Sequence, residues 1–134
     1  MKSKDRWTNS KTAVYNLAYH LIWCPKYRKK VLVDEVEARL KELIKEKADE
    51  LNCTIGSMEI MPDHVHLFIK TPPTIGVHFL IRQIKGYTSR VLRKEFKQLR
   101  TKIPCLWTRS YYAESVGHIS EQTIQKYIEN QKNK

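Results

Sequence analysis

The sequence lacks the features that mark membrane, zinc-binding and secreted proteins. No apolar run is long enough to cross a lipid bilayer as a helix. The three cysteines, Cys24, Cys53 and Cys105, are odd in number and far apart, so we expect reduced thiols and neither a zinc knuckle nor a disulfide framework. Residues 1–12 lack the apolar stretch of a signal peptide, and we therefore expect a cytoplasmic protein.

Acidic residues are also scarce, and their shortage gives the first indication of a partner. The 134-residue chain has 25 lysines and arginines against 14 acidic residues, which gives a net charge of +11. This excess favours a phosphate-rich partner, although a generically soluble basic protein has the same balance. An anionic membrane fits less well, because the basic residues are not gathered beside an apolar anchor. The length allows one ordinary domain. Catalysis and binding of the partner must therefore use the same domain, or two copies of the chain must cooperate.

The hydrophobic patterns predict a ferredoxin-like α+β domain. Branched and aromatic segments, some with strict alternation, predict strands over 13–23, 53–60, 64–70 and 106–114. Apolar residues at helical spacing predict helices over 34–51 and 74–98, and a further helix is predicted over 120–131. The order is βαββαβ followed by one helix. It predicts an antiparallel four-stranded sheet with helices on one face and an open face on the other.

A pair of histidines stands out in the third predicted strand. His64 and His66 are two residues apart, so both side chains point to the same side of a strand, opposite Val65 and Leu67. Two imidazoles side by side on an open sheet face can chelate one divalent ion. Two surface histidines without a ligand produce the same spacing. His20, on the first predicted strand, is an alternative ligand.

The last predicted helix contains a tyrosine and a glutamine on one face. Tyr127 and Gln131 are four residues apart and therefore project together. A tyrosine hydroxyl has a pKa of about 10, so it needs help to act as a nucleophile at neutral pH. A nearby divalent cation would polarise the scissile phosphate, and the amide oxygen of Gln131 is a reasonable third ligand for Mg²⁺ or Mn²⁺. Alternatively, Tyr127 only packs in the helix and Gln131 faces solvent.

Four motifs occur together in a matching order. They are WCPKYR at 23–28, MPDHVHLFI at 61–69, KGYTS at 85–89 and YIENQ at 127–131. Together they resemble the single-tyrosine HUH transposases of the smallest insertion sequences, the TnpA type, from about residue 13 to 131. The resemblance implies Tyr127 as the catalytic nucleophile and His64, His66 and Gln131 as ligands of Mg²⁺ or Mn²⁺.

The resemblance further implies a homodimer in which the histidines of one subunit work with the tyrosine helix of the other. Such enzymes bind hairpin-containing single-stranded DNA, cleave it through a 5′-phosphotyrosine intermediate and rejoin the strands. One departure is visible: many members have two small residues before the last helix, where this chain has Gly117 and His118. The departure bears on exchange of the helix between subunits and leaves the chemistry unaffected.

Two basic segments are candidates for DNA contact, and a solvated basic face is their alternative explanation. In the loop predicted over 24–30, the candidates are Lys26, Arg28, Lys29 and Lys30. On the helix predicted over 74–98, they are Arg82, Lys85, Arg90 and Arg93. Tyr27 and Tyr87 are candidates for stacking on unpaired bases. We expect residues 1–12 to form a flexible basic arm and residues 13–134 a single catalytic and DNA-binding domain.

Three other functions fit parts of this pattern. A non-catalytic RNA- or DNA-binding module on the same fold would place aromatic residues on the central strands, where this chain has histidines. A domesticated relative would process repeated hairpins without moving an element. A plain metal hydrolase would use Tyr127 only structurally.

Overall fold

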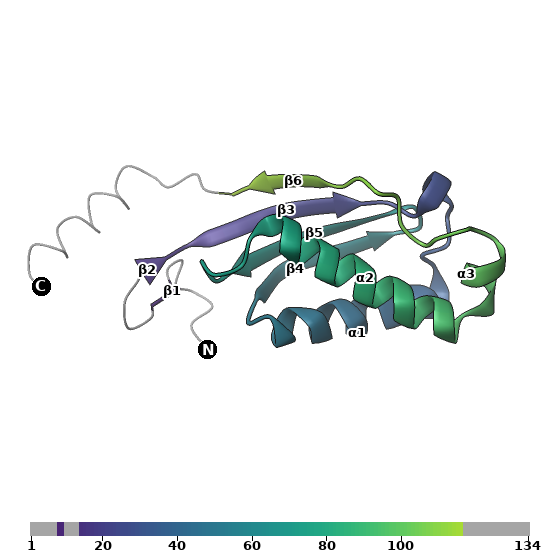
Figure 1. Ribbon diagram of the computed structural model, residues 1–134, viewed down its shortest axis with the longest axis horizontal. Coiled ribbons are helices and arrows are strands. Elements are labelled where there is room, and N and C mark those ends of the chain that lie inside the picture. Colours follow the sequence, from purple (N-terminus) through teal and green to yellow (C-terminus); the bar gives the residue numbers. More distant parts are fainter. Residues whose placement is uncertain (1–7, 10–13, 117–134) are drawn as a thin grey trace, which may run out of the picture.

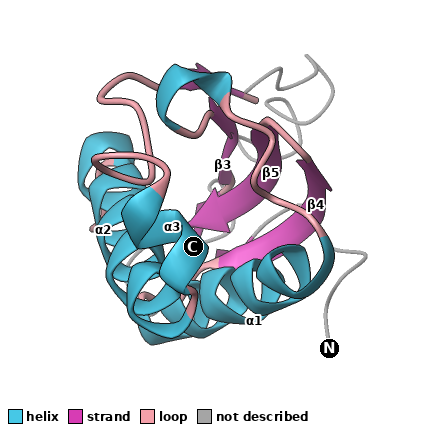
Figure 2. Cartoon of the chain, turned by 90° about the vertical axis from the view of Figure 1, so that its right-hand side faces the viewer, coloured by secondary structure: helices cyan, strands magenta, loops and turns pink. Residues whose placement is uncertain are grey.

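The computed structural model describes residues 8–9 and 14–116 of the chain. The main sheet has four antiparallel strands in the order β4 (Thr54–Met61), β5 (His64–Thr71), β3 (Leu17–Trp23) and β6 (Tyr112–Ser115). The helices α1 (Asp34–Glu50) and α2 (Val77–Glu95) cover one face of this sheet, and the short α3 (Lys97–Thr101) follows α2 (Figures 1 and 2). The predicted ferredoxin-like α+β fold is confirmed.

The alternation of β5 separates the hydrophobic core from the open face. Val65, Leu67 and Ile69 are fully buried in the core cluster shared with α1 and α2. The alternate residues, which include both histidines of the predicted pair, are only half-buried on the opposite face. Burying a branched side chain contributes ~1.5–3 kcal/mol, so a one-residue slip of this strand would be costly. The packing that holds the apolar residues inside therefore also holds both histidines on the open face.

Thr88 links α2 to the segment that precedes β6. It is fully buried, and its hydroxyl donates a hydrogen bond to the carbonyl of Ile84 at 2.8 Å. The same hydroxyl accepts a hydrogen bond from the indole nitrogen of Trp107 at 3.0 Å. Trp107 in turn packs edge-on against Trp23 of β3, with ring centroids 5.9 Å apart. Thr88 therefore stabilises the contact between the helix layer and the end of the sheet.

We expect Thr88→Val to lower the free energy of unfolding by ~1–3 kcal/mol, because it leaves the buried indole N–H of Trp107 without an acceptor. Urea denaturation followed by tryptophan fluorescence measures the loss. A double-mutant cycle with Trp107→Phe isolates the hydrogen bond from the packing. Strictly additive effects of the two substitutions would contradict this role of Thr88.

The helix predicted over 74–98 is wrong at both ends, because α2 begins at Val77 and ends at Glu95. Phe96 adopts an extended conformation (φ −119°, ψ 106°), and α3 starts after it. One nitrogen of the Arg93 guanidinium donates to the carbonyls of Leu99 and Ile103 at 3.0 and 3.1 Å. Arg93, predicted as a DNA contact, is half-buried and stabilises the turn after α2.

The strand predicted over 106–114 begins only at Tyr112, because the backbone before it bonds elsewhere. The carbonyl of Leu106 accepts a hydrogen bond from the amide of Lys26, and the amide of Thr108 donates to the carbonyl of Cys24. The Lys85 side chain donates to the carbonyls of Thr108 and Ser110. The two backbone bonds form an isolated antiparallel bridge between Pro25 and Trp107, and the Lys85 bonds hold the residues after it beside α2.

At the other end of the domain, the predicted strand 13–23 is divided into β2 (Val14–Tyr15) and β3. β1 (Thr8–Asn9), inside the predicted basic arm, pairs with β2 in the antiparallel sense. Across the described part of the chain, no helix is both long and apolar enough to span a membrane.

Candidate functional site

His64 opens β5, and its ring is held by the residue before it. Nδ1 of His64 lies 2.9 Å from Oδ1 of Asp63, and the other carboxylate oxygen accepts a hydrogen bond from Arg28 at 2.9 Å. The hydrogen bond from His64, followed by that from Arg28, lowers the pKa of Asp63. An ionised carboxylate can only accept, so in the neutral imidazole the proton lies on Nδ1 and the lone pair of Nε2 is available to a ligand. A carboxylate–histidine pair of this kind is typical of metal ligands.

Asp63 and its contact with Arg28 were not among the predicted features of the site. The signal was present, because a carboxylate directly before a candidate metal ligand is a candidate for orienting it. The contact brings the loop that contains η1 (Lys26–Arg28) to the start of β5. It therefore places one predicted DNA-binding segment beside the histidine pair.

His66 contacts a third histidine on the neighbouring strand. Nε2 of His66 lies 3.2 Å from Nδ1 of His20, and the two ring centroids are 5.2 Å apart. The ring of Phe68, which is opposite His20 in the strand register, packs against it with ring centroids 5.0 Å apart. His20, His66 and Phe68 thus form one connected group on the open face of β3 and β5.

Position 56, on the strand β4 that pairs with β5, requires glycine because of this group. Gly56 of β4 lies at an irregularity in the pairing with β5, and a Cβ built there would be 2.3 Å from the ring of Phe68. Any side chain at position 56 would therefore displace Phe68 or the strand. The missing side chain leaves the space that the Phe68 ring occupies beside His20.

The histidines of the open face are suitable ligands for a divalent metal ion, but by themselves they do not complete its coordination. Unprotonated imidazole nitrogens bind Mn²⁺, Co²⁺ and Zn²⁺ well and Mg²⁺ less well. Within residues 8–9 and 14–116, no group of three or more histidine, cysteine or carboxylate side chains could hold a metal ion. Tyr127 and Gln131, the predicted nucleophile and third ligand, lie outside the described residues, as do Gly117 and His118.

The loop after β3 exposes an aromatic ring and several cations. Tyr27 and Arg28 both have positive φ values, 59° and 51°, a conformation that costs energy for side chains of this size. The ring of Tyr27 is 68% exposed, and the ammonium of Lys26 lies 5.4 Å from its centre. Lys29 and Lys30 are exposed beside it. The strained backbone thus presents an aromatic ring and positive charges to solvent next to Asp63.

A second basic surface lies along α2. A groove of about 620 Å³ runs between this helix and the 105–111 segment, with Arg82, Arg109 and Tyr111 among its lining residues. Lys85 forms part of it, and burial lowers the pKa of this lysine. Arg90 is exposed further along the helix, 5.5 Å from the ring centre of Tyr87. Arg109 and Tyr111 were not predicted as site residues, because only the folded loop brings them to α2.

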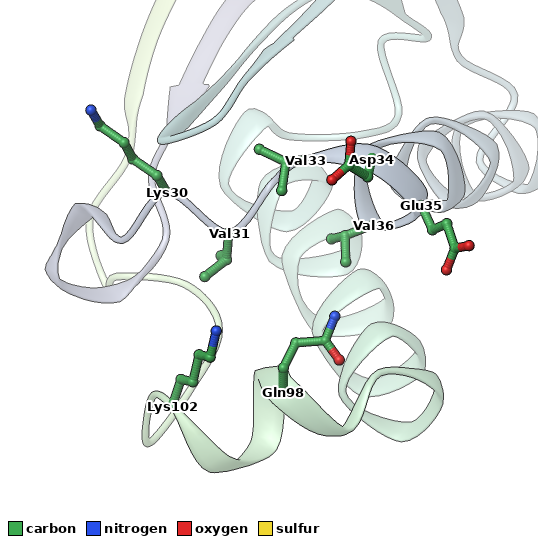
Figure 3. A pocket seen from close by; sticks show the side chains of 8 residues that line it. All are labelled: Lys30, Val31, Val33, Asp34, Glu35, Val36, Gln98 and Lys102. Carbon is green, nitrogen blue, oxygen red and sulfur yellow. The ribbon is translucent and has the colours of Figure 1, made fainter.

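A further hollow of about 390 Å³ lies between the start of α1 and the α3 segment. Figure 3 shows Lys30 and Asp34 on one side and Gln98 and Lys102 on the other. Its lining mixes both signs of charge, with Glu35 next to Asp34. None of the three histidines of the open face lines it. We therefore do not associate this hollow with the metal site.

Comparison with known proteins agrees with the fold and identifies a family. The family model described as "Transposase IS200 like" matches residues 13–131. The chain belongs to this family of IS200-like transposases, enzymes that cleave and transfer DNA strands.

Two relatives and two solved structures give the extent of the similarity. The ISDra2 transposase TnpA of Deinococcus radiodurans is 40% identical over 123 residues, covering 90% of this chain and 88% of the relative. The transposase of insertion sequence IS200 from Salmonella typhimurium is 29% identical over 119 residues, covering 87% and 78%. A crystal structure of a Deinococcus radiodurans transposase superposes with a TM-score of 0.78 at 36% identity, covering 92% of this chain and 97% of that one.

The second structure is a REP-associated tyrosine transposase bound to a REP hairpin. It has a TM-score of 0.58 and 11% identity, and the superposition covers 90% of this chain and 67% of that one. At this identity the similarity supports the fold alone.

Proposed function

We propose that this transposase binds hairpin-containing single-stranded DNA, cleaves it through Tyr127 and rejoins the strands in a metal-dependent transesterification. The observation that carries the proposal is the histidine pair on the open face, with His64 oriented by Asp63 so that Nε2 is free to coordinate. Neither α1 nor α2 covers the face that presents these two imidazoles. Such an open face suits a site that must admit both a DNA strand and the helix with the nucleophile. The IS200-like family membership supports the same chemistry.

The proposed reaction exchanges one phosphodiester for another and needs no external energy source. The hydroxyl oxygen of Tyr127 attacks the scissile phosphorus, the new oxygen–phosphorus bond forms, and the bond to the 3′ oxygen breaks. The phenol loses one proton and the departing 3′ oxygen gains one, leaving a 5′-phosphotyrosine and a free 3′-hydroxyl. Attack of a 3′-hydroxyl on the phosphotyrosine reverses the chemistry and joins strands. A divalent metal, Mg²⁺ or Mn²⁺, would neutralise the charge that develops on the phosphate.

Three side chains are proposed to hold this metal. His64 would coordinate through Nε2, because Asp63 holds its other nitrogen. His66 is the second ligand on the same face, and Gln131 is proposed as an amide ligand. Asp63 orients one ligand, and its pair with the exposed Arg28 connects the metal site to the loop proposed to hold DNA.

DNA is proposed to contact both basic surfaces. Lys26, Arg28, Lys29 and Lys30 would bind phosphates beside the metal site, with Tyr27 stacking on an unpaired base. Along α2, Arg82, Lys85 and Arg90 line or adjoin the groove, whereas Arg93 is engaged by the backbone of the α3 turn. The distant structural neighbour that shares this fold is itself bound to a REP hairpin. A homodimer with two equivalent sites suits the exchange of two DNA ends.

The form of the substrate tests the proposal directly. We expect the protein to cleave single strands from the two flanks of its own gene, where a strand folds into a hairpin, and to leave the annealed duplex of the same sequence intact. EDTA should abolish cleavage, and added Mn²⁺ or Mg²⁺ should restore it. Denaturing gels of end-labelled strands measure the products, and a strand with its hairpin stem scrambled is the control. Equal cleavage of the blunt duplex would contradict the single-strand specificity.

A further inference from the structure

We propose that one DNA strand lies in the groove between α2 and the 105–111 segment, with its sugar–phosphate backbone in direct contact with the helix at Gly86. The inference rests on the proposed function, because the strand belongs to the same DNA substrate. It adds a residue without a side chain to the proposed binding surface. It also fixes the point at which the DNA comes closest to the protein backbone.

Gly86 stands in the interior of α2, where nothing in the described part of the chain requires a glycine. The helix continues through it from Val77 to Glu95, and no described glycine has a positive φ value. Outside its own helical turns, no atom of the described residues lies within 4 Å of a Cβ built at position 86. An interior glycine destabilises a helix relative to alanine. Its presence here fits a ligand that approaches the helix backbone closely.

The groove exposes this position to a ligand. Its α2 side is a stripe of residues at helical spacing, namely His78, Arg82, Lys85, Gly86 and Ser89. Gly86 is exposed and lies one turn after Arg82 and one turn before Ser89. The missing side chain therefore leaves a gap in this stripe, through which a ligand can reach the helix backbone.

The cations of the groove are available to phosphate. Arg82 and Arg109 are exposed, and neither guanidinium has a hydrogen bond or ion pair with another described residue. Arg93 of the same helix, by contrast, is bonded to backbone carbonyls. Among the described residues that line the groove, none is acidic. Guanidinium groups from both sides of the groove can therefore bind the phosphates of a strand that passes over Gly86.

The size and lining of the groove favour one strand over a duplex. Its volume of about 620 Å³ is that of a site for one small molecule, and a double helix is much larger. The ring of Tyr111 also lines it, and Nδ1 of His78 lies 2.9 Å from the Tyr111 hydroxyl. A positively charged groove with an aromatic ring for stacking is the arrangement that binds unpaired strands.

Enlarging residue 86 tests the contact. Gly86→Ala should raise the melting temperature by about 3–5 °C, because alanine is the better helix former, and yet weaken DNA binding by about threefold. Gly86→Leu should weaken binding by about tenfold or more, since its side chain fills the space that the strand needs. The measurement is fluorescence anisotropy of a labelled hairpin-containing strand from the flank of the gene, in EDTA so that no cleavage occurs.

Gly76→Ala is the matched control for this substitution. Gly76 precedes α2, and a Cβ built there also has no atom of the described residues within 4 Å. It is not among the described residues that line the groove. We expect Gly76→Ala to bind the labelled strand like the wild type.

Cys105 provides a direct probe of the occupied groove. It lines the groove, and it is exposed, whereas Cys24 is half-buried and Cys53 is buried. A saturating concentration of the strand should slow the alkylation of Cys105 by N-ethylmaleimide in the wild type. The same concentration should protect Cys105 less in Gly86→Leu. Mass spectrometry of peptides separates the three cysteines.

The outcomes distinguish this inference from the proposed function. If the wild type binds the hairpin strand, then either unchanged affinity in both Gly86 variants or unprotected Cys105 would overturn the inference alone. Failure of the wild type to bind any hairpin strand would overturn the proposed function. Protection of Cys105 without DNA that increases with protein concentration would overturn the inference and identify a second copy of the chain as the occupant. Gly86→Ala keeps the test decisive if Gly86→Leu does not fold.

Discussion

Tyr127→Phe is expected to abolish the covalent attachment of this protein to DNA while leaving hairpin binding at the wild-type level. The substitution removes one oxygen atom and keeps the aromatic ring. Without that oxygen there is no nucleophile to form the phosphotyrosine bond, and loss of a catalytic nucleophile is among the largest effects of a single substitution. Binding is expected to persist, because it depends on the basic surfaces and on stacking.

The measurement is a denaturing gel with DNA labelled at its 3′ end, since the 3′ fragment retains the phosphate that joins tyrosine. Wild-type protein should produce a slow, denaturant-resistant band, and Tyr127→Phe should produce none. Tyr19→Phe is the matched control: Tyr19 pairs in β3 and packs against the core, and its hydroxyl has no hydrogen-bond partner among the described residues. An adduct at the wild-type level in Tyr127→Phe would rule out this nucleophile, and peptide mapping would identify the tyrosine used instead.

Mixing two inactive proteins is expected to restore cleavage in part. His64→Ala/His66→Ala lacks two metal ligands but keeps Tyr127, and Tyr127→Phe has the reverse defect. Each protein alone should be inactive. If each site takes its histidines from one subunit and its tyrosine from the other, a heterodimer has one intact site and one doubly defective site. Random exchange at equal concentrations would then restore about a quarter of the wild-type sites.

Sites assembled within one subunit predict the opposite result, because every subunit in the mixture has its own defect. The readout is the same covalent adduct, measured against total protein after subunit exchange. Native mass spectrometry of the mixture must show heterodimers, so that a failure to exchange is recognised. Heterodimers without any cleavage would exclude assembly in trans. The control is a chain with all three substitutions, which should stay inactive when mixed with either of the other two proteins, because no site in such a heterodimer has both the histidine pair and the tyrosine.

Much of the fold could be predicted because it depends on local periodicity. The alternation of β5 and the helical spacing in α1 are properties of neighbouring residues, and the structure places both as expected. The predictions failed where distant backbone groups compete for hydrogen bonds. Residues 106–111 have strand-like composition, but only Trp107 pairs, in an isolated bridge with Pro25, and Lys85 binds the carbonyls of Thr108 and Ser110. Arg93 was assigned to DNA by its charge, whereas its guanidinium donates to the carbonyls of Leu99 and Ile103.

The sequence by itself determined the chemistry available to this protein: a histidine pair with strand spacing, a tyrosine and a glutamine with helical spacing, and an excess of positive charge. It also determined that both histidines share a face, because side chains alternate along a strand. Only the tertiary structure decided which distant residues contact this part of β5. Arg28 reaches Asp63, and His20 reaches His66, across 35 and 46 positions of the chain. Such contacts depend on strand order and register, which arise when whole elements pack around one core, and no local pattern records them.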